Sequence, residues 1–215
     1  LATPGDKAQK LAEVLSLSSG DAFFLHLASQ WQHPESVVMG AHEPATLLTD
    51  PGAWPDTGHL AQWMMAMDAQ SYLPDDILVK VDRAAMANSL ETRVPMLDHR
   101  VVELAWRLPP QQKIRDGEGK WLLRQVLYRH VPRALVERPK MGFAIPLDSW
   151  LRGPLRDWAE ALLDERRLRH EGYFHPAPIR RKWQEHLGGR HNWQYPLWTV
   201  LMFQAWLQET RRTSL

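Results

Sequence analysis

The sequence has 215 residues, of which 44% are apolar, a formal net charge of +1 and no cysteine. A chain of this length can bury one substantial core or two small ones. The near-neutral charge gives no indication of a nucleic-acid or membrane partner, and the lack of cysteine excludes disulfides, thiolate metal sites and a cysteine nucleophile within these residues.

The chain carries no recognisable targeting or membrane segment. No apolar run approaches the roughly 18 residues that suggest a membrane span, and the opening residues, LATPGDKAQK, lack the apolar core of a signal peptide. We therefore expect a cytoplasmic protein. Because the first residue is leucine and not methionine, we also expect the sequence to be an internal piece of a longer polypeptide.

Helical periodicity dominates the first 71 residues. The pattern predicts helices over residues 6–17, 22–31 and 58–71, with a loop rich in His, Pro, Gly and Thr before the third. Short extended pieces, such as residues 36–39, are compatible with this loop. Methionine and alanine fill the third helix, which is typical of core packing.

Residues 71–98 carry the densest set of charges in the chain. A helix is predicted over residues 74–88, because its proline presets the backbone and the two aspartates that follow favour a helix N-terminus. Asp82 shares a face with Val79 and Met86. We therefore expect this carboxylate to lie in an apolar stripe, where it needs a partner.

Two more charges follow this helix in an extended turn. The residue before a proline avoids helical angles, so Val94 is expected to be extended. Glu91 and Arg93 then point to the same side of the backbone. Two interpretations remain open for these charges: a buried ion-pair network that fixes a corner of the fold, or a site for an anionic ligand.

Two further helices lead to a second charged loop. Residues 98–108 form the first, with Asp98 as its N-cap, and residues 120–130 form the second. Residues 111–119 between them are interpreted as a polar connector.

The loop ERPKMGF comes next, and Pro139 and Gly142 predict a tight turn around Lys140. A lysine on a glycine-containing loop is a common way to hold a phosphate. The alternative is a lysine that is merely exposed on a turn.

The remaining residues read as helical packing. Helices are predicted over residues 147–151, 153–163, 176–187 and 193–209, and the charged run 164–170 is interpreted as a solvated face. The expected fold class is mainly α, without a convincing strand pair. The ten histidines have no metal-binding spacing on a helix, so no metal site is expected.

The string KVDRAAMANSLETRVPMLD resembles the signature of the synthetase domain of glutamine-hydrolysing asparagine synthetases. The positions that fit the family pattern are Lys80, Asp82, Arg83, Met86, Ser89, Leu90, Glu91, Arg93, Pro95, Leu97 and Asp98. Runs beginning at Asp68, Lys120 and Arg138 are similar to the family as well. The core of the match covers residues 68–155.

The resemblance implies an enzyme that activates a carboxylate, most simply that of aspartate, with Mg-ATP and then transfers ammonia from glutamine to form an amide. It also implies roles for six residues. Those implied in catalysis are Lys140, Arg93 and Glu91, and those implied in substrate or ATP contacts are Asp82, Arg83 and Lys80. The resemblance assigns no metal ligand to this chain, and Mg²⁺ would be bound mainly elsewhere in the enzyme.

Three features of the family are missing from the sequence. They are an S-G-G-x-D-S loop for ATP, a G-[ED]-G-x-D-E-x-x-G-G run and the cysteine of the glutaminase domain. Residues 1–215 are therefore expected to be the helical C-terminal part of an α/β adenylating synthetase domain whose parallel-sheet nucleotide-binding half is absent. We expect this chain alone to be inactive. Its expected partners are the glutaminase and nucleotide-binding domains of the same protein, with homo-oligomers as a further option.

Two alternatives stay open at this point. A related amidoligase could act on another carboxylate, such as a sugar acid or a beta-lactam precursor. A helical interaction module could keep the fold without the chemistry. An S-G-G-x-D-S loop upstream of Leu1 would favour a ligase over the interaction module.

Overall fold

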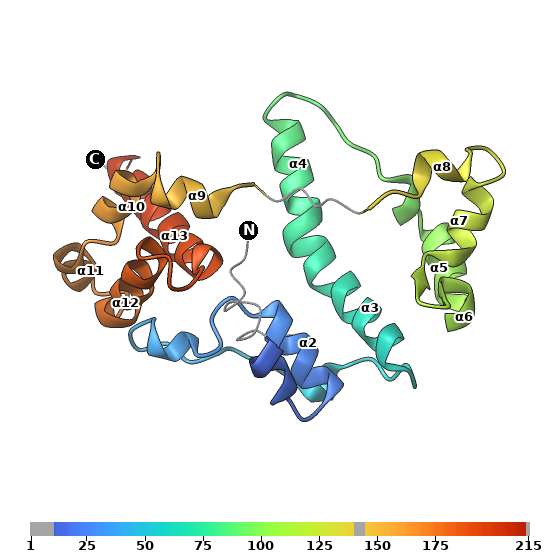
Figure 1. The fold of residues 1–215 in the computed structure, drawn as a ribbon, viewed down its shortest axis with the longest axis horizontal. Coiled ribbons are helices and arrows are strands. Elements are labelled where there is room, and N and C mark those ends of the chain that lie inside the picture. The colour runs from blue at the N-terminus through green and yellow to red at the C-terminus, as the bar shows by residue number, and fades with distance from the viewer. Residues whose placement is uncertain (1–10, 140–144, 214–215) are drawn as a thin grey trace. The chain divides into compact units, whose positions relative to one another are not determined.

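The computed structural model describes residues 11–139 and 145–213. The chain divides into two compact units, which we call unit 1 (residues 1–53 and 144–215) and unit 2 (residues 54–143). The described residues are mainly helical, as predicted, and contain a single sheet of two short strands (Figure 1).

Unit 2 begins with helical backbone that changes type along its length. Helix α3 (Leu60–Gln70) is followed by a π-helix (Leu73–Leu78) and then by α4 (Val79–Met86). The sequence predicts a helix that begins at Pro74, but Tyr72 already has helical angles. Pro74 is tolerated because it lies in the first turn of the π-helix, where a missing N–H costs little.

The other helices of unit 2 are short. They are α5 (His99–Arg107), α6 (Pro110–Lys113), α7 (Trp121–Leu127) and α8 (Arg133–Val136). Asp98 caps α5 as predicted, because its Oδ1 accepts a hydrogen bond from the backbone N–H of Arg100 at 2.9 Å. The hydrogen bond from the Arg100 side chain also lowers the pKa of this carboxyl.

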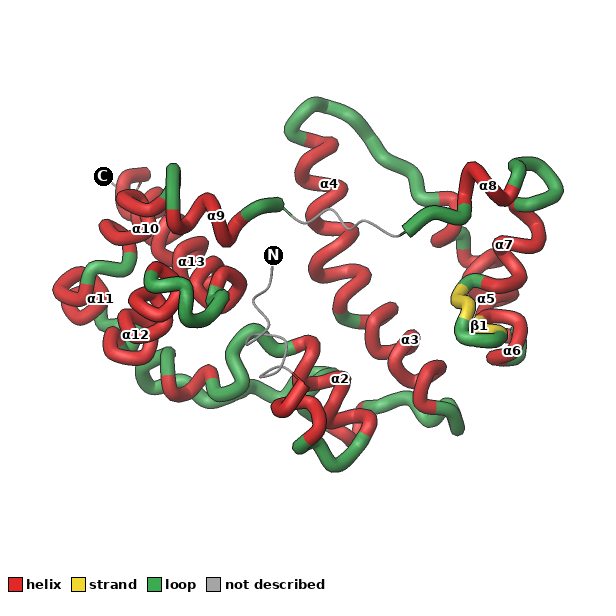
Figure 2. The backbone as a smooth tube through the Cα atoms, viewed as in Figure 1, coloured by secondary structure: helices red, strands yellow, loops and turns green. Residues whose placement is uncertain are grey.

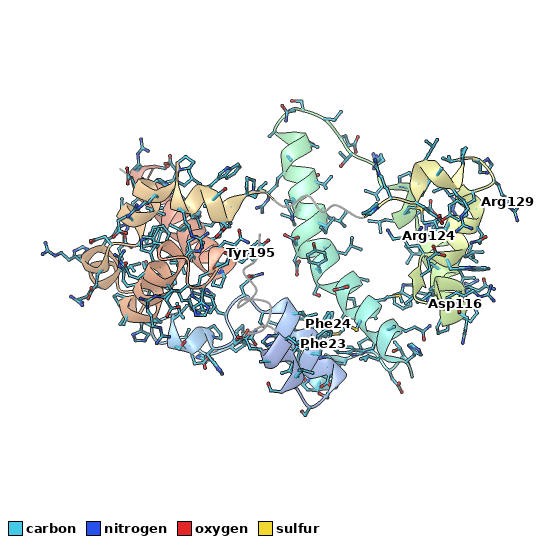
Figure 3. All side chains as sticks on the ribbon, viewed as in Figure 1. Phe23, Phe24, Asp116, Arg124, Arg129 and Tyr195 are labelled. Atoms are coloured by element: carbon cyan, nitrogen blue, oxygen red, sulfur yellow. The ribbon has the colours of Figure 1, made fainter. Side chains whose placement is uncertain are left out.

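A small hairpin lies where the sequence predicted only a polar connector. Strand β1 (Ile114–Arg115) pairs antiparallel with β2 (Glu118–Gly119), as Figure 2 shows. Asp116, labelled in Figure 3, and Gly117 form its turn with φ of 52° and 77°. Two successive left-handed residues match the right-handed twist of paired strands, and an Asp-Gly pair favours this turn. The expectation of no strand pair was therefore wrong here.

Unit 1 has a core built mainly from the C-terminal helices. Its helices include α2 (Gly20–Ala28), α9 (Leu147–Arg152), α10 (Arg156–Leu162), α11 (Glu165–Glu171), α12 (Pro176–Leu187) and α13 (Gln194–Thr213). The bounds predicted for α12 agree with the structure. Fully buried side chains at the centre of this core include Leu151, Leu163, Leu168, Ile179, Trp183, Leu197 and Leu201.

The loop before α3 takes part in this core. Val38 forms an antiparallel bridge with Phe174, and the N–H of His175 donates to the carbonyl of Val37 at 2.8 Å. Val37 is 2% exposed and belongs to the hydrophobic cluster. The extended piece expected at residues 36–39 is not formed as a whole, because a 3-10 helix covers Pro34–Ser36 and Val37 has helical angles. Only Val38 forms a bridge, and it joins the loop to the C-terminal helices.

The charged run at residues 164–170 is not simply a solvated face. It forms most of α11, and Leu168 is completely buried. The Glu171 side chain, which ends this helix, is only 6% exposed. The interpretation is confirmed for the charged side chains other than the half-buried Arg167. It did not include Leu168, the apolar residue that anchors this two-turn helix on the core.

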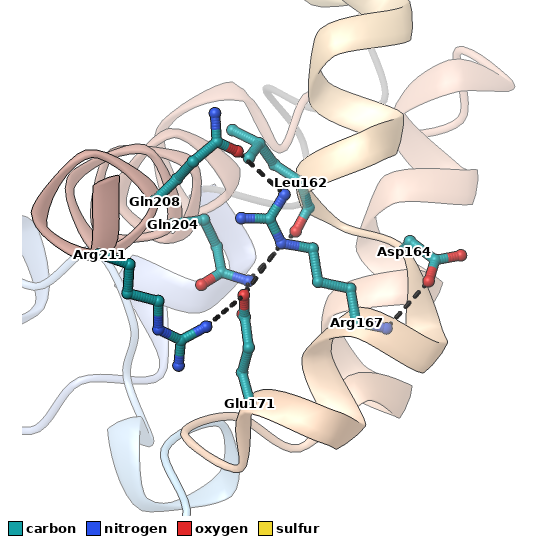
Figure 4. Close-up of polar contacts among 7 residues, drawn as sticks. All are labelled: Leu162, Asp164, Arg167, Glu171, Gln204, Gln208 and Arg211. Carbon is teal, nitrogen blue, oxygen red and sulfur yellow. Dashed lines mark hydrogen bonds and ion pairs between the residues drawn. The ribbon is translucent and has the colours of Figure 1, made fainter. Parts of the chain in front are cut away.

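A polar network crosses this core between α11 and α13 (Figure 4). The buried Gln204 donates from Nε2 to the carbonyl of Leu162 at 3.2 Å and to Glu171 at 2.6 Å. Arg167 Nε also donates to Glu171, at 3.0 Å, and its Nη1 donates to Gln208. Charge-assisted bonds of this kind offset the cost of burying a carboxylate.

We expect Gln204→Met to destabilise unit 1. Methionine keeps the volume but removes the donor, so the Leu162 carbonyl and the Glu171 carboxylate lose a partner, at a cost of about 1–3 kcal/mol. Urea unfolding measures the loss. Gln208→Met, on the exposed side of the same helix, removes only the exposed hydrogen bond from Arg167. It is the comparison variant and should cost less than about 1 kcal/mol. Equal effects of the two substitutions would contradict a structural role for the buried amide.

His186 is a buried ionisable group in the same unit. Its Nδ1 accepts a hydrogen bond from the backbone N–H of Trp193 at 3.2 Å, and its ring stacks on Trp183. The side chain is completely buried, and its Nε2 lies 3.8 Å from an oxygen of Asp148. Burial, with a further contribution from Arg152, lowers the pKa of His186 from 6.5 to about 4.

This pKa makes unit 1 sensitive to acid. The unfolded chain takes up a proton at His186 near pH 6.5 and the folded chain only near pH 4, so stability is full above pH 6.5 and falls as the pH drops from 6.5 to 4. The expected loss is about 3 kcal/mol, and urea unfolding between pH 4 and 7.5 measures it. His186→Gln should flatten the dependence, whereas His170→Gln, at an exposed position of α11, should not. An unchanged slope in His186→Gln would refute this origin of the acid sensitivity.

Candidate active-site residues

The first group of predicted site residues lies on α4 and faces solvent. Lys80 donates to Asp76 at 2.9 Å, one helical turn earlier. This hydrogen bond raises the pKa of Lys80. The ammonium is therefore held in place on the helix surface, where a ligand can reach it.

Asp82 and Arg83 are also exposed. Of the two apolar residues that share a face with Asp82, Val79 is half-buried and Met86 is 54% exposed, so the carboxylate lies beside a partly covered stripe and is itself open to solvent. Within residues 11–139 and 145–213 no ion pair involves either Asp82 or Arg83. The described residues therefore cover the apolar positions of this helix only in part, with Ile77 and Val79 half-buried.

The second group lies in the turn after α4. Ser89, in the turn after α4, has a left-handed conformation with φ of 56°. Val94 is extended as predicted, with φ of −114° and ψ of 93°. Glu91 and Arg93 do point to the same side, because they form an ion pair at 2.6 Å. Their side chains are 70% and 83% exposed, so the interpretation of a buried ion-pair network is excluded for this pair.

The two groups are not joined to each other. Among the residues that the structure describes, no hydrogen bond or ion pair connects Lys80, Asp82 or Arg83 with the Glu91–Arg93 pair. Each group is held locally by its own stretch of backbone. Lys140, the third predicted element of the site, lies outside the described residues.

A further polar cluster, which the sequence analysis did not identify, lies on α7 and α8. It consists of Arg124, labelled in Figure 3, with Tyr128, Arg133 and Glu137. Arg124 and Tyr128 are half-buried. The spacing of four residues between Arg124 and Tyr128, and between Arg133 and Glu137, was the signal in the sequence, since such pairs meet on a helix face.

Neither a metal site nor a membrane span is found in the described part of the chain. No group of three or more His, Cys, Asp or Glu side chains there is placed to hold an ion. Its helices are all too short or too polar to cross a bilayer.

Comparisons with known proteins give one consistent family. A family model described as asparagine synthase matches residues 4–208. Asparagine synthetase [glutamine-hydrolyzing] 1 of Bacillus subtilis is 33% identical over 143 residues, and a putative asparagine synthetase of Mycobacterium tuberculosis H37Rv is 41% identical over 144. Asparagine synthetase of Rattus norvegicus is 30% identical over 141 residues, covering 56% of this chain and 24% of the relative.

The two bacterial alignments each cover 66% of this chain but only 22% of the relative. The chain thus spans about a fifth of the length of these curated relatives. No solved structure is significantly similar to it. Since the family model covers nearly the whole sequence, this chain belongs to the asparagine synthase family.

Proposed function

We propose that this chain is the helical part of an ATP-dependent ligase that activates the side-chain carboxylate of aspartate and converts it to an amide with ammonia from glutamine. The observation that carries the proposal is the family match over residues 4–208, which includes a charged segment left open to solvent. The glutaminase and nucleotide-binding parts would belong to the same polypeptide, outside these 215 residues.

The proposed reaction has two steps. A carboxylate oxygen attacks the α-phosphorus of ATP, and pyrophosphate leaves with the electrons of the broken P–O bond. Ammonia then attacks the acyl carbon, AMP leaves, and the nitrogen loses a proton. Negative charge therefore develops first on the phosphates and then on the acyl oxygen.

The cationic side chains of this chain could stabilise the negative charge that develops in both steps. Fixed positive groups that face a charged transition state contribute much of the catalysis in phosphoryl and adenylyl transfer. We assign the main role to Lys140, with Arg93 in support, and contacts with the nucleotide or the substrate to Lys80 and Arg83. Lys80 and Arg93 are each already oriented by a carboxylate neighbour.

The carboxylates have complementary roles in the proposal. Glu91 forms an ion pair with Arg93 that would orient this cation, and it would also accept a proton from the attacking nitrogen. Asp82 would orient a neighbouring cation. Since the family resemblance assigns no metal ligand to this chain, the Mg²⁺ that accompanies ATP would be held mainly by the nucleotide-binding part.

We expect Lys140→Ala to abolish most of the activity. In the complete encoded polypeptide, with aspartate, Mg-ATP and ammonium chloride, kcat for pyrophosphate release should fall by about 10²–10³-fold. Arg129→Ala, which removes an exposed cation of unit 2, is the control and should stay within about twofold. The 215-residue chain alone should release no pyrophosphate. Near-normal turnover of Lys140→Ala would refute the assigned role.

Asp82→Asn and Arg93→Gln should lower the catalytic activity without lowering the stability of the fold. Both side chains are exposed, so each change should alter the free energy of unfolding by less than about 0.5 kcal/mol. In the complete polypeptide each should still lower kcat/KM for aspartate by about tenfold or more. Thermal unfolding and steady-state kinetics give the two numbers. If activity is unchanged with aspartate and with a panel of other carboxylates, these residues have no part in the chemistry.

A further inference from the structure

Helix α13 carries a row of exposed residues on the side opposite the buried Leu201 and Gln204. The row, which we call the outer row, advances in alternating steps of four and three residues through Tyr195, Thr199, Met202, Trp206, Glu209 and Thr213. Tyr195, labelled in Figure 3, is 51% exposed, Met202 39% and Trp206 59%. This spacing is the one with which two helices pack along a shared seam.

Aromatic contacts hold the middle of the outer row. The Trp206 ring lies 5.7 Å from the ring of Phe203, which meets Tyr173 edge-to-face at 5.4 Å. Tyr173 is itself 43% exposed. The apolar surface is therefore wider than one helix, and it presents aromatic side chains, which contribute much of the binding energy at protein interfaces.

A half-buried cation lies near one end of the outer row. Lys182 Nζ is 3.3 Å from the centre of the Trp193 ring and 5.1 Å from that of Trp31. Trp31 Nε1 donates to Thr199 Oγ1 at 3.2 Å, so Trp31 links this cation to the row.

Lys182 has no carboxylate held against it in the described residues. No ion pair there involves Lys182, and Glu185 on the same helix accepts a hydrogen bond from Trp193 Nε1 at 2.6 Å. Burial lowers the pKa of Lys182. A carboxylate brought close to this ammonium would therefore stabilise its charged form.

The outer row is complementary to itself when two copies pair antiparallel. A two-fold axis midway between Met202 and Trp206 places each of these residues opposite the other in the second copy. The same axis places Glu209 at the level of Thr199 in the second copy, and so on the side where Lys182 lies. Both pairings occur twice, as an isologous interface requires.

We propose that the outer row of α13 is a homodimer interface. Two copies of this chain pair antiparallel through Met202 and Trp206, and Glu209 of each copy meets Lys182 of the other. The 20-residue helix is about 30 Å long, so the interface is at the small and weak end of specific contacts. We therefore expect a dissociation constant in the micromolar range. The inference goes beyond the proposed function and does not depend on it.

Sedimentation of the 215-residue chain measures this dissociation constant. Trp206→Glu should raise it by about tenfold or more, because it places a charge from each copy in the apolar centre. Met202→Glu is the second variant. Leu135→Glu, at a 70% exposed position of unit 2, is the matched control and should leave the constant within about twofold. Melting temperatures within about 2 °C of the parent would show that each variant keeps the fold.

The charges at the ends of the interface have their own test. Glu209→Gln and Lys182→Met should each raise the dissociation constant about threefold, and the double variant should raise it no further. Losses that multiply in the double variant would show that these two side chains do not meet.

Engineered thiols report the register, because the sequence contains no cysteine. A chain with both Thr199→Cys and Glu209→Cys should form intermolecular disulfides on mild oxidation, since a disulfide needs Cα atoms within about 7 Å. Neither substitution alone should do so, because the two copies of one residue would lie about 15 Å apart along the helix axis. Dimers of the single variants would instead indicate a parallel pair and overturn the arrangement.

The remaining outcomes separate a second copy from other occupants of this surface. A chain that stays monomeric at the highest concentrations, or a dissociation constant that Trp206→Glu and Met202→Glu leave unchanged, would overturn the proposal. In the complete encoded polypeptide Trp206→Glu should also weaken self-association. If it has no effect there, another part of the polypeptide covers the outer row, and the homodimer interface is refuted.

Discussion

Unit 1 buries far more apolar side chains than unit 2, and the other features of the structure depend on this difference. From residue 71 to residue 139 no residue is buried, and the buried residues in the described part of unit 2 lie on α3. Unit 1 has a continuous core with completely buried side chains such as Trp183 and Leu201. Unit 2 therefore relies on helix caps, local ion pairs and a hairpin turn, each worth about 1 kcal/mol or less.

The shortage of buried side chains in unit 2 also explains which features of the candidate site could be predicted from the sequence. The sequence predicted the residue types of the candidate site, the extended Val94 and the placement of Glu91 and Arg93 on the same side of the backbone. The sequence did not predict how exposed these residues are. An apolar stripe beside Asp82 indicates that this helix face packs against another surface, but it does not identify that surface. The cluster around Glu137 was missed since its members come from two helices and a cap.

The fold was predictable where one strong local signal determined it. Asp98 as an N-cap and the bounds of α12 are such cases. The fold prediction failed where two local patterns in the sequence indicated different structures. The hairpin at Asp116 has strands of only two residues each and lies inside a polar stretch. The hydrogen bond from Gln204 of α13 to Glu171 also joins residues far apart in the sequence. Such contacts between distant residues leave no periodic trace in a single sequence.

The π-helix at residues 73–78 has a consequence for how this segment tolerates change. A π-turn holds one residue more than an α-turn between its hydrogen-bonded groups. Removing one residue there would restore an ordinary helix and rotate all that follows by about 100° around the axis. The charges of α4 would then face another side relative to the buried face of α3. Spacing within this stretch thus matters more than the identity of most of its side chains, and one-residue insertions or deletions would be more harmful than substitutions.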